Sequence, residues 1–499
     1  MEPEYSKSNH KLSSQDFAIL LAAVVAGVCV YLLFSVVTDS IGFPLDDSWI
    51  HLTYARNLAI YGQWAFRLGH PSAGSTAPLW TFLLALGFLL HLGPYIWAYL
   101  LGSLTLFSLS ALAEQTARKI VSTYQPRYPW IGIFFALEWH LLWAAMSGME
   151  TLLHALIILT VIAGLMTGSR RYLTLGLLTG LSVWVRPDGI TLIGPVLLTV
   201  LFVEGTITEK IRALVMYFIG FGSLFVPYLL FNLWLSGTPM PNTFYAKQTE
   251  YALWQAQPLV ERLVILLVQL LTGPSAFLFP GVIGFILLAI RRQAWPMIAG
   301  FMWCIGYFLL YILRLPAYQH GRYLMPAMPI FFLFGLLGYF EFTKSSLFGR
   351  KHVAIKIAWQ LSIALLTFCF VVLGARSYGE DVGLIQSEMV VTAKWVAMNL
   401  PPNAILAAHD IGALGYYDDH ELIDLAGLVS PEVIPFMRDE ARLAKYLDQK
   451  NANYLIAFPA FYPELTRNLE PVFISGGKFA PAIGEKNMTV YQWSALSGK

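Results

Sequence analysis

The stretch from Phe17 to Val37 reads FAILLAAVVAGVCVYLLFSVV, 21 residues without a charge between Asp16 and Asp39. As a helix rising 1.5 Å per residue, it would cross the roughly 30 Å hydrocarbon core of a bilayer. It is longer than the apolar region of a signal peptide, so we expect it to be retained as a membrane span. The whole chain agrees, because 57% of its 499 residues are hydrophobic and only 12% are charged, against about 25% charged in soluble domains.

Charged residues are spread unevenly along the chain. Residues 1–375 contain 37 of them, about 10%, whereas residues 376–499 contain 25, about 20%. This difference predicts a polytopic transmembrane domain over 1–375 and a soluble domain over 376–499. Short apolar strands alternate with helical patterns in the second part, so we expect a small α/β domain there.

The apolar runs and the positive charges predict how the chain crosses the membrane. Residues 78–114 should cross once in two pieces broken at His91 to Pro94, and 258–272 should be re-entrant or interfacial. Fifteen of the 22 basic residues of 1–375 fall in alternate loops, which the positive-inside rule assigns to the cytoplasm. With about 11 spans, the N-terminus is then cytoplasmic and 376–499 lies outside the plasma membrane. The other expected spans are 128–146, 149–167, 172–186, 190–204, 213–235, 275–290, 294–313, 322–341 and 353–375.

Several classes of function are disfavoured by composition. A net charge of +2 provides no basic surface for nucleic acid. The three cysteines, Cys29, Cys304 and Cys369, lie in apolar runs without Cys-x-x-Cys or Cys/His spacing, which argues against a disulfide framework or a zinc site.

Seven basic residues fall in or beside the outer loops, where the positive-inside rule disfavours them. Snorkelling at span ends would account for any one of them. An anionic ligand on the outer face, such as a lipid-linked phosphate, would account for the group, because arginine offers several donors to a phosphate. These residues are Arg56, Arg67, Arg186, Lys247, Arg262, Arg314 and Arg322.

The first outer loop, 38–78, carries two adjacent carboxylates, Asp46 and Asp47. The residues from Ser48 onward are compatible with a short helix lying at the membrane interface. One aspartate would suffice to cap such a helix. A second one at the same place favours chemistry, with one carboxylate acting as general base and the other orienting an acceptor, an arginine or a metal.

This loop resembles the first extracytoplasmic loop of polyprenyl-phosphate-sugar-dependent glycosyltransferases of the GT-C fold. Within that superfamily, the chain is most similar to the group around the cell-wall terminal arabinofuranosyltransferases. The resemblance covers nearly the whole chain and rests on ordered motifs. They are Asp46-Asp47 with Tyr-Ala-Arg-Asn at 54–57, Gly-Ser-Thr-Ala-Pro-Leu-Trp at 74–80, Ser-Gly-Met-Glu-Thr at 147–151, Arg-Pro-Asp-Gly at 186–189, Pro-Asn-Thr-Phe-Tyr-Ala-Lys at 241–247, Arg-Tyr-Leu-Met-Pro at 322–326, and the segments 410–416 and 424–431.

The resemblance implies a membrane α-helical GT-C fold that transfers a sugar from a polyprenyl-phosphate donor to a glycan or glycolipid acceptor. An acidic residue of the first loop serves as base in such families, so it implies this role for Asp46, with Asp47 as partner or alternative. A single base and a good leaving group imply inversion at the anomeric carbon. We further expect donor phosphate or sugar to be bound by Arg56, Arg186, Lys247, Arg322 and Tyr245.

Alternatives remain for individual residues and for the function. Arg186 could instead pair locally with Asp188, and Tyr245 with Lys247 could belong to an interfacial aromatic belt. Asp46 and Asp47 could hold a hard divalent cation, but no complete ligand set is visible, so we predict no cofactor. A transporter or flippase of lipid-linked sugars is the alternative function. It would not require adjacent carboxylates outside the membrane, and neither inverted repeats nor broken midplane helices are evident in the sequence.

Overall fold

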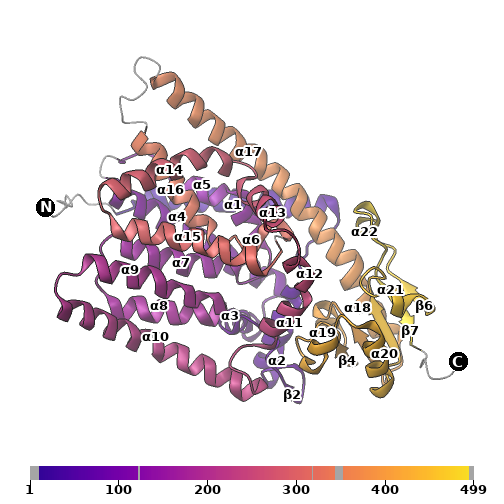
Figure 1. Cartoon of the computed structure of the whole chain (residues 1–499). Helices are drawn as coiled ribbons and strands as arrows, with labels where there is room; N and C mark the ends of the chain where they lie inside the picture. The colour runs from indigo at the N-terminus through magenta and orange to yellow at the C-terminus, as the bar shows by residue number, and fades with distance from the viewer. Residues whose placement is uncertain (1–10, 122–123, 317, 343–351, 494–499) are drawn as a thin grey trace.

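The computed structural model describes residues 11–121, 124–316, 318–342 and 352–493. Helices make up most of the molecule, and a small sheet lies at one end, next to the C-terminus (Figure 1). The helix α17, His352–Ile385, leads from the helical part toward that sheet. The helical body and the small C-terminal α/β part expected from the sequence are therefore present.

Five helices among the described residues are long and apolar enough to cross a membrane. Many of their large apolar side chains, such as Leu21, Leu33 and Leu230, are exposed, as expected for surfaces that face lipid rather than water. These helices are α1 Ser14–Thr38, α4 Pro94–Ile120, α10 Ile207–Ser236, α15 Trp295–Arg314 and the run Val353–Asn399, which contains α17.

The remaining apolar helices are shorter or bent. Helix α13, Leu259–Leu271, meets α14, Ser275–Arg291, at an angle of 100°, which is compatible with the re-entrant segment expected there. The total of about 11 spans stays a prediction. The shorter helices are α3 Pro78–Leu89, α5 Trp130–Leu137, α6 Trp139–Met146, α7 Thr151–Met166, α8 Tyr172–Val185, η1 Pro187–Leu192, α9 Ile193–Val203 and α16 Met328–Phe342.

Two expected spans differ in the structure. The run 128–146 is broken between α5 and α6 at Glu138, whose carboxylate accepts a hydrogen bond from the Leu141 backbone N–H and so caps α6. The span expected from 322 begins only at Met328. Arg322 therefore precedes the helix, in a turn that faces the first outer loop.

The first outer loop folds into α2, Asp47–Tyr61, followed by the short strands β1, Ala65–Arg67, and β2, His70–Pro71. We expected α2 to lie at the membrane interface with its aromatic residues at headgroup depth. Instead Trp49 and Tyr54 are fully buried, because α2 packs against α3 on one side and α19, Gly412–Tyr417, on another. The loop is thus an internal layer between the helical body and the C-terminal part (Figure 1).

The C-terminal part contains a five-stranded sheet in the order β4-β3-β5-β7-β6. Strand β3 pairs in parallel with β4 and β5, and β7 pairs antiparallel with β5 and β6. All five strands lie within one residue of those that the sequence predicts at 404–408, 421–425, 454–458, 471–474 and 488–493. Their bounds are β3 Ile405–Ala408, β4 Glu421–Asp424, β5 Tyr454–Ala457, β6 Glu470–Ile474 and β7 Thr489–Gln492, and the accompanying helices include α18 Val391–Asn399 and α20 Glu440–Gln449.

The division at 375/376 falls inside α17, which runs on to Ile385 and continues through the π-helical turn η4, Gln386–Val390, into α18. A boundary at this point stays a prediction. The structure shows a continuous helical connection there and not a flexible linker.

Candidate active site

The two adjacent aspartates of the first loop point to different partners. Both carboxylate oxygens of Asp46 accept backbone hydrogen bonds, from Gly412 N–H at 2.6 Å and Ala413 N–H at 2.8 Å. Asp47 begins α2 and accepts a hydrogen bond from Nη2 of Arg322 at 2.8 Å. Asp46 therefore holds the N-terminus of α19, and Asp47 faces the membrane part.

The other end of α19 is also held by the first loop. Arg56 donates to the carbonyl of Tyr416 at 2.6 Å and to that of Gly415 at 3.3 Å. Arg67 donates to the carbonyl of Asp418 at 2.7 Å. Negative charge at the start of α19 and positive charge at its end both match the dipole of the helix. These contacts join the first loop to both ends of α19.

Two glycines of α19, Gly412 and Gly415, allow this helix to approach the first loop closely. A Cβ on Gly412 would lie 2.0 Å from the backbone oxygen of Asp46, and one on Gly415 would lie 2.0 Å from the ring of Phe66. No other residue type fits at these positions without a shift of the backbone or of a buried ring.

Asp47 belongs to a cluster with two cations and a tyrosine. Nη2 of Arg322 also donates to the Tyr323 hydroxyl at 2.9 Å, and Nζ of Lys247 donates to the same hydroxyl at 2.8 Å. Arg322 is only 7% exposed, yet its Nε and Nη1 have no hydrogen-bond partner among the described residues. Buried guanidinium donors without a partner are costly. They indicate a place for an anion.

The surroundings of the two aspartates shift their pKa values in opposite directions. Burial, reinforced by the charge of Asp410, raises the pKa of Asp46 to about 7 despite its two backbone hydrogen bonds. Burial alone would also raise the pKa of Asp47, but the charges of Arg322 and Lys247 outweigh it and lower that pKa to about 2. Asp47 is therefore a carboxylate at neutral pH, and its side chain is 35% exposed, because cavities reach it.

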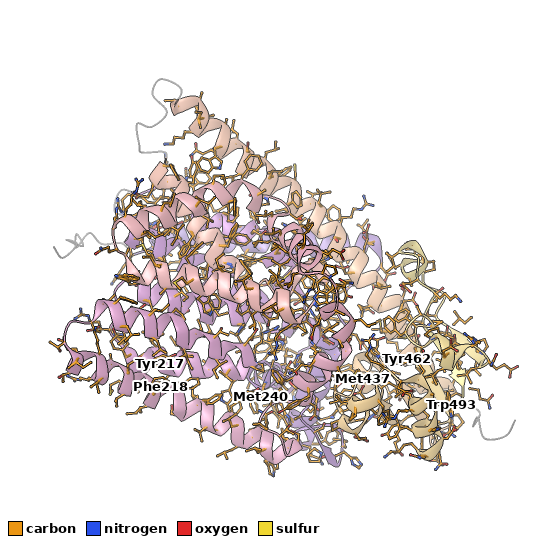
Figure 2. All side chains as sticks on the ribbon, in the orientation of Figure 1. Tyr217, Phe218, Met240, Met437, Tyr462 and Trp493 are labelled. Atoms are coloured by element: carbon orange, nitrogen blue, oxygen red, sulfur yellow. The ribbon has the colours of Figure 1, made fainter. Side chains whose placement is uncertain are left out.

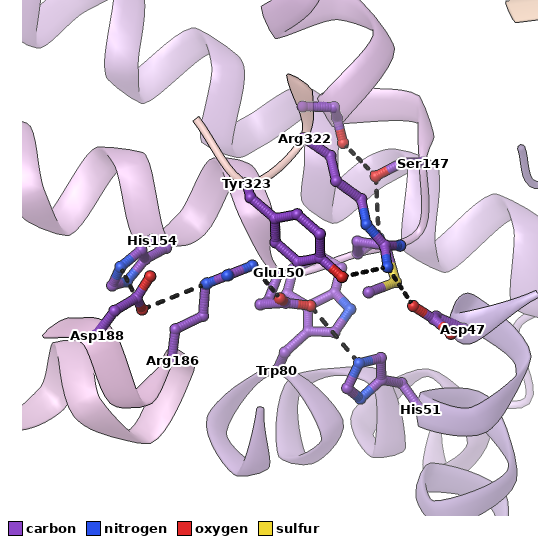
Figure 3. A network of polar contacts seen from close by, with 12 residues as sticks. Asp47, His51, Trp80, Ser147, Glu150, His154, Arg186, Asp188, Arg322 and Tyr323 are labelled. Atoms are coloured by element: carbon purple, nitrogen blue, oxygen red, sulfur yellow. Dashed lines mark hydrogen bonds and ion pairs between the residues drawn. The ribbon is translucent and has the colours of Figure 1, made fainter. Parts of the chain in front are cut away.

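A chain of charged contacts extends from the first loop into the helical body (Figure 3). Nε2 of His51 lies 3.5 Å from Glu150, and Nη1 of Arg186 lies 3.2 Å from the other oxygen of Glu150. Nε of Arg186 is 3.4 Å from Asp188, which is also 3.3 Å from His154. The expected local pair of Arg186 and Asp188 thus exists, and it fixes the guanidinium where it borders a cavity.

Two cavities meet at this cluster. The first, of about 440 Å³, lies in the helical part. Arg186, Glu150, Arg314 and Met240 are among the residues that border it, and the surface that it exposes is mainly apolar. The second, of about 700 Å³, lies between the helical and C-terminal parts. Figure 2 marks Met240 of the first cavity, and Met437 and Tyr462 of the second. The residues that border both are Asp47, Ile50, Lys247, Arg322 and Leu428.

The expected site residues therefore separate into three groups. Asp47, Lys247 and Arg322 lie together between the cavities, and Arg186 borders the first of them. Asp46 borders the second cavity with its oxygens occupied by backbone N–H groups. Arg56 binds carbonyls of α19, and Tyr245 borders neither cavity, so the structure gives no support to donor binding by these two.

Several residues that border the cavities were not expected from the sequence. His51, Tyr311 and Tyr323 border the first cavity, and Trp254 borders the second. Glu150 and His154 are four positions apart, a spacing that would suit a pair of metal ligands on one helical face, but their side chains have separate partners, Arg186 and Ser182. Among the described residues, no group of three or more His, Cys, Asp or Glu is placed to hold a metal ion.

The arrangement of helices is similar to that of solved structures with the GT-C fold. It matches the crystal structure of ArnT from Cupriavidus metallidurans bound to undecaprenyl phosphate with a TM-score of 0.59. The identity is 16%, over 97% of this chain and 99% of that one. An oligosaccharyltransferase from Archaeoglobus fulgidus matches with a TM-score of 0.58 and 11% identity, over 88% of this chain and 69% of that one.

The arabinofuranosyltransferase AftD from Mycobacteria has a TM-score of 0.53 and 16% identity, over 97% of this chain and 40% of that longer chain. At these identities the likeness concerns the fold. Residues 381–491 match a family model described as a domain of unknown function (DUF8728). No curated protein matches the sequence.

Proposed function

We propose that this protein transfers a sugar from a polyprenyl-phosphate donor to a glycan or glycolipid acceptor. The observation that carries the proposal is the meeting of two cavities at Asp47, Lys247 and Arg322. A transferase needs separate places for donor and acceptor that open onto one another at the reacting atoms. A carboxylate and two cations at this junction supply a base and a binding site for the leaving phosphate.

The first cavity suits the donor. The surface that it exposes is mainly apolar, as a prenyl chain requires. Four cations, Arg186, Lys247, Arg314 and Arg322, outnumber the three carboxylates of Asp47, Glu150 and Asp188 around it. The unpartnered Nε and Nη1 of Arg322 are donors that a phosphate oxygen would satisfy. The ArnT structure of the same fold contains undecaprenyl phosphate, which supports a lipid phosphate as ligand.

Asp47 is the better candidate for the base, although the family resemblance first pointed to Asp46. Each oxygen of Asp46 already accepts an N–H of α19, and these bonds hold its carboxylate against the C-terminal part. Asp47 borders both cavities. We therefore assign general-base catalysis to Asp47 and positioning of α2 against α19 to Asp46.

The chemistry is a single displacement. The acceptor oxygen forms a bond to the anomeric carbon and gives its proton to Asp47. The bond from that carbon to the phosphate oxygen breaks, and the electron pair leaves with the polyprenyl phosphate. One displacement inverts the anomeric configuration.

Donor binding would also make Asp47 a stronger base. Its pKa of about 2 results from Arg322 and Lys247, and a phosphate bound to the same cations brings negative charge close to the carboxylate. Negative charge nearby disfavours the ionised form and raises the pKa. The base would thus be strengthened when the leaving group is in place, and no metal is needed for this step.

We also propose that the reaction takes place at the outer face of the plasma membrane. The distribution of basic residues supports this side, because Lys7 and Lys11 precede the first span and are predicted to be cytoplasmic, whereas Asp47 follows that span. The same rule supports a cytoplasmic N-terminus and an extracytoplasmic C-terminal part.

The test is donor consumption by the purified protein in lipid vesicles, with a panel of polyprenyl-phosphate sugars and a mixture of glycan and glycolipid acceptors. We expect loss of one donor with the wild type. Asp47→Asn should reduce the rate about 10²- to 10⁴-fold, the usual contribution of general-base catalysis. Asp46→Asn is the comparison variant. It removes one acceptor for the N–H groups of α19, so it should lower the unfolding temperature and reduce the rate less than Asp47→Asn does.

A second readout separates transport from transfer. Vesicles loaded with the same lipids can be assayed for movement of the sugar headgroup across the bilayer. Movement without consumption of any donor would refute the transferase and establish the flippase.

A further inference from the structure

The second cavity has unpaired polar groups on two opposite walls. Oδ2 of Asp410, in the loop between β3 and α19, is buried without a hydrogen-bond partner among the described residues. Nε1 of Trp254, in the short helix α12, Ala252–Gln255, is likewise buried and without a partner, and the whole Trp254 side chain is only 9% exposed. One group accepts a hydrogen bond and the other donates one, which is the pair a hydroxylated ligand would satisfy.

Aromatic rings surround the same space. Those of Tyr251, Trp254 and Tyr318 come from the helical part, and those of Phe461 and Tyr462 come from the C-terminal part. Phe461 and Tyr318 are about half exposed, at 51% and 54%. The negative face of an aromatic ring attracts the C–H edges of a sugar ring. Rings on two sides, with a donor and an acceptor between them, are suited to a carbohydrate.

The charge of this cavity restricts which carbohydrate can bind. Away from the cluster of Asp47, the described residues around it include Glu250, Asp410 and Glu440 against a single arginine, Arg438. Arg438 donates to the backbone oxygen of Glu250. Lys247 and Arg322 lie at the junction with the first cavity, where Asp47 and Tyr323 engage them. A ligand with phosphate or carboxylate groups would be repelled.

We propose that the second cavity binds an uncharged carbohydrate acceptor, with Asp410 accepting a hydrogen bond from one of its hydroxyls and Trp254 donating to another. This inference rests on the proposed transfer function and specifies the class of acceptor. It also gives a role to the segment 381–491, since Asp410 belongs to it. Burial and the charge of Asp47 raise the pKa of Asp410 to about 7, so this carboxyl can accept or donate a hydrogen bond near neutral pH.

The test is direct binding of oligosaccharides to the full chain in lipid nanodiscs by calorimetry, without any donor. The probes are neutral tetrasaccharides of glucose, mannose and arabinose, each paired with its terminally phosphorylated counterpart. We expect a neutral probe to bind and its phosphorylated form to bind at least tenfold more weakly. Binding of no neutral probe, or tighter binding of the phosphorylated forms, would overturn the proposal.

Oligosaccharide binding by single-residue variants tests whether the ligand occupies the second cavity. Asp410→Asn should weaken binding about tenfold or more, since hydrogen bonds to charged groups are the stronger ones. Trp254→Phe keeps an aromatic ring but removes the N–H, and should weaken binding several-fold. Asp419→Asn changes an exposed aspartate that borders neither cavity, and should bind like the wild type. Equal affinity in all three variants would refute the site.

This readout is independent of catalysis. If the protein consumes a donor in an Asp47-dependent manner but binds no neutral oligosaccharide, the inference fails and the proposed function stands. If it binds a neutral oligosaccharide but consumes no donor, the proposed function fails, while the carbohydrate site remains.

Discussion

Replacement of Gly412 by alanine tests the contact between the first loop and the C-terminal part. The added Cβ would lie 2.0 Å from the backbone oxygen of Asp46 and 2.7 Å from its Oδ2, whereas real Cβ contacts are almost never shorter than 3.0 Å. The backbone oxygen of Asp46 also accepts the Trp49 N–H at 2.9 Å, in the first turn of α2. Either α19 or the start of α2 must therefore move by about 1 Å.

The free energy of this change has two parts. Overpacking a filled contact costs about 1 to 3 kcal/mol, and weakening the charge-assisted hydrogen bonds to Asp46 adds about 1.5 to 3 kcal/mol for each bond lost. The better helix propensity of alanine offsets about 1 kcal/mol at most. We expect a destabilisation of about 2 to 5 kcal/mol.

Activity should fall more than stability alone explains, because Asp47 directly follows Asp46. A displacement of 1 Å at a reacting group can reduce a rate about 10²-fold. Donor consumption and thermal unfolding of the purified variant measure the two effects. Gly222→Ala in α10 is the matched control, since a Cβ there meets nothing within 4 Å. Wild-type turnover and unfolding temperature in Gly412→Ala would refute the described contact.

Further predictions concern charge, pH and metal. Arg186→Lys should raise the donor KM about tenfold, because lysine cannot reproduce the contacts of the guanidinium with both Glu150 and Asp188; an unchanged KM would remove Arg186 from the donor site. Burial raises the pKa of Asp46 to about 7 and that of Asp424 to about 6. Between about pH 4 and pH 7, the folded chain therefore retains protons that the unfolded chain has released, so stability should fall as pH rises through this range. Thermal unfolding at pH 5.5 and pH 8 checks the sign, and a higher unfolding temperature at pH 8 would contradict it. Donor consumption should survive treatment with EDTA, and a loss that Mg²⁺ or Mn²⁺ restores would show that a cation takes part.

The sequence predicted the helical body and the five strands because both depend on local patterns. Apolar runs long enough to span a bilayer identify membrane helices, and short apolar stretches between turns identify strands. The break at Glu138 also had a local signal, a single acid inside the run 128–146. No local pattern in the sequence indicated that α2 would be buried, because its amphipathic pattern fits a membrane surface as well as a protein interior.

The sequence indicated which residues are candidates for the site, but it did not indicate which of them contact one another. Asp46 and Gly412 are separated by 366 positions, and no local pattern indicates that two such residues meet. The same holds for Arg56, whose place in the first loop suggested a phosphate but whose partners are carbonyls of α19. Residue type and the predicted side of the membrane narrowed the candidates, whereas the proposal that Asp47 rather than Asp46 is the base required long-range contacts.

The helical run Val353–Asn399 comprises 47 residues, about 70 Å at 1.5 Å per residue. Because this run is a continuous helix, a bend or twist of its apolar part would be passed on to the sheet that follows it. The π-helical turn η4 is the one described point in the run where the backbone hydrogen-bonding pattern changes. A change in the tilt of this helix would therefore displace the sheet and, with it, the walls of the second cavity that the C-terminal part contributes.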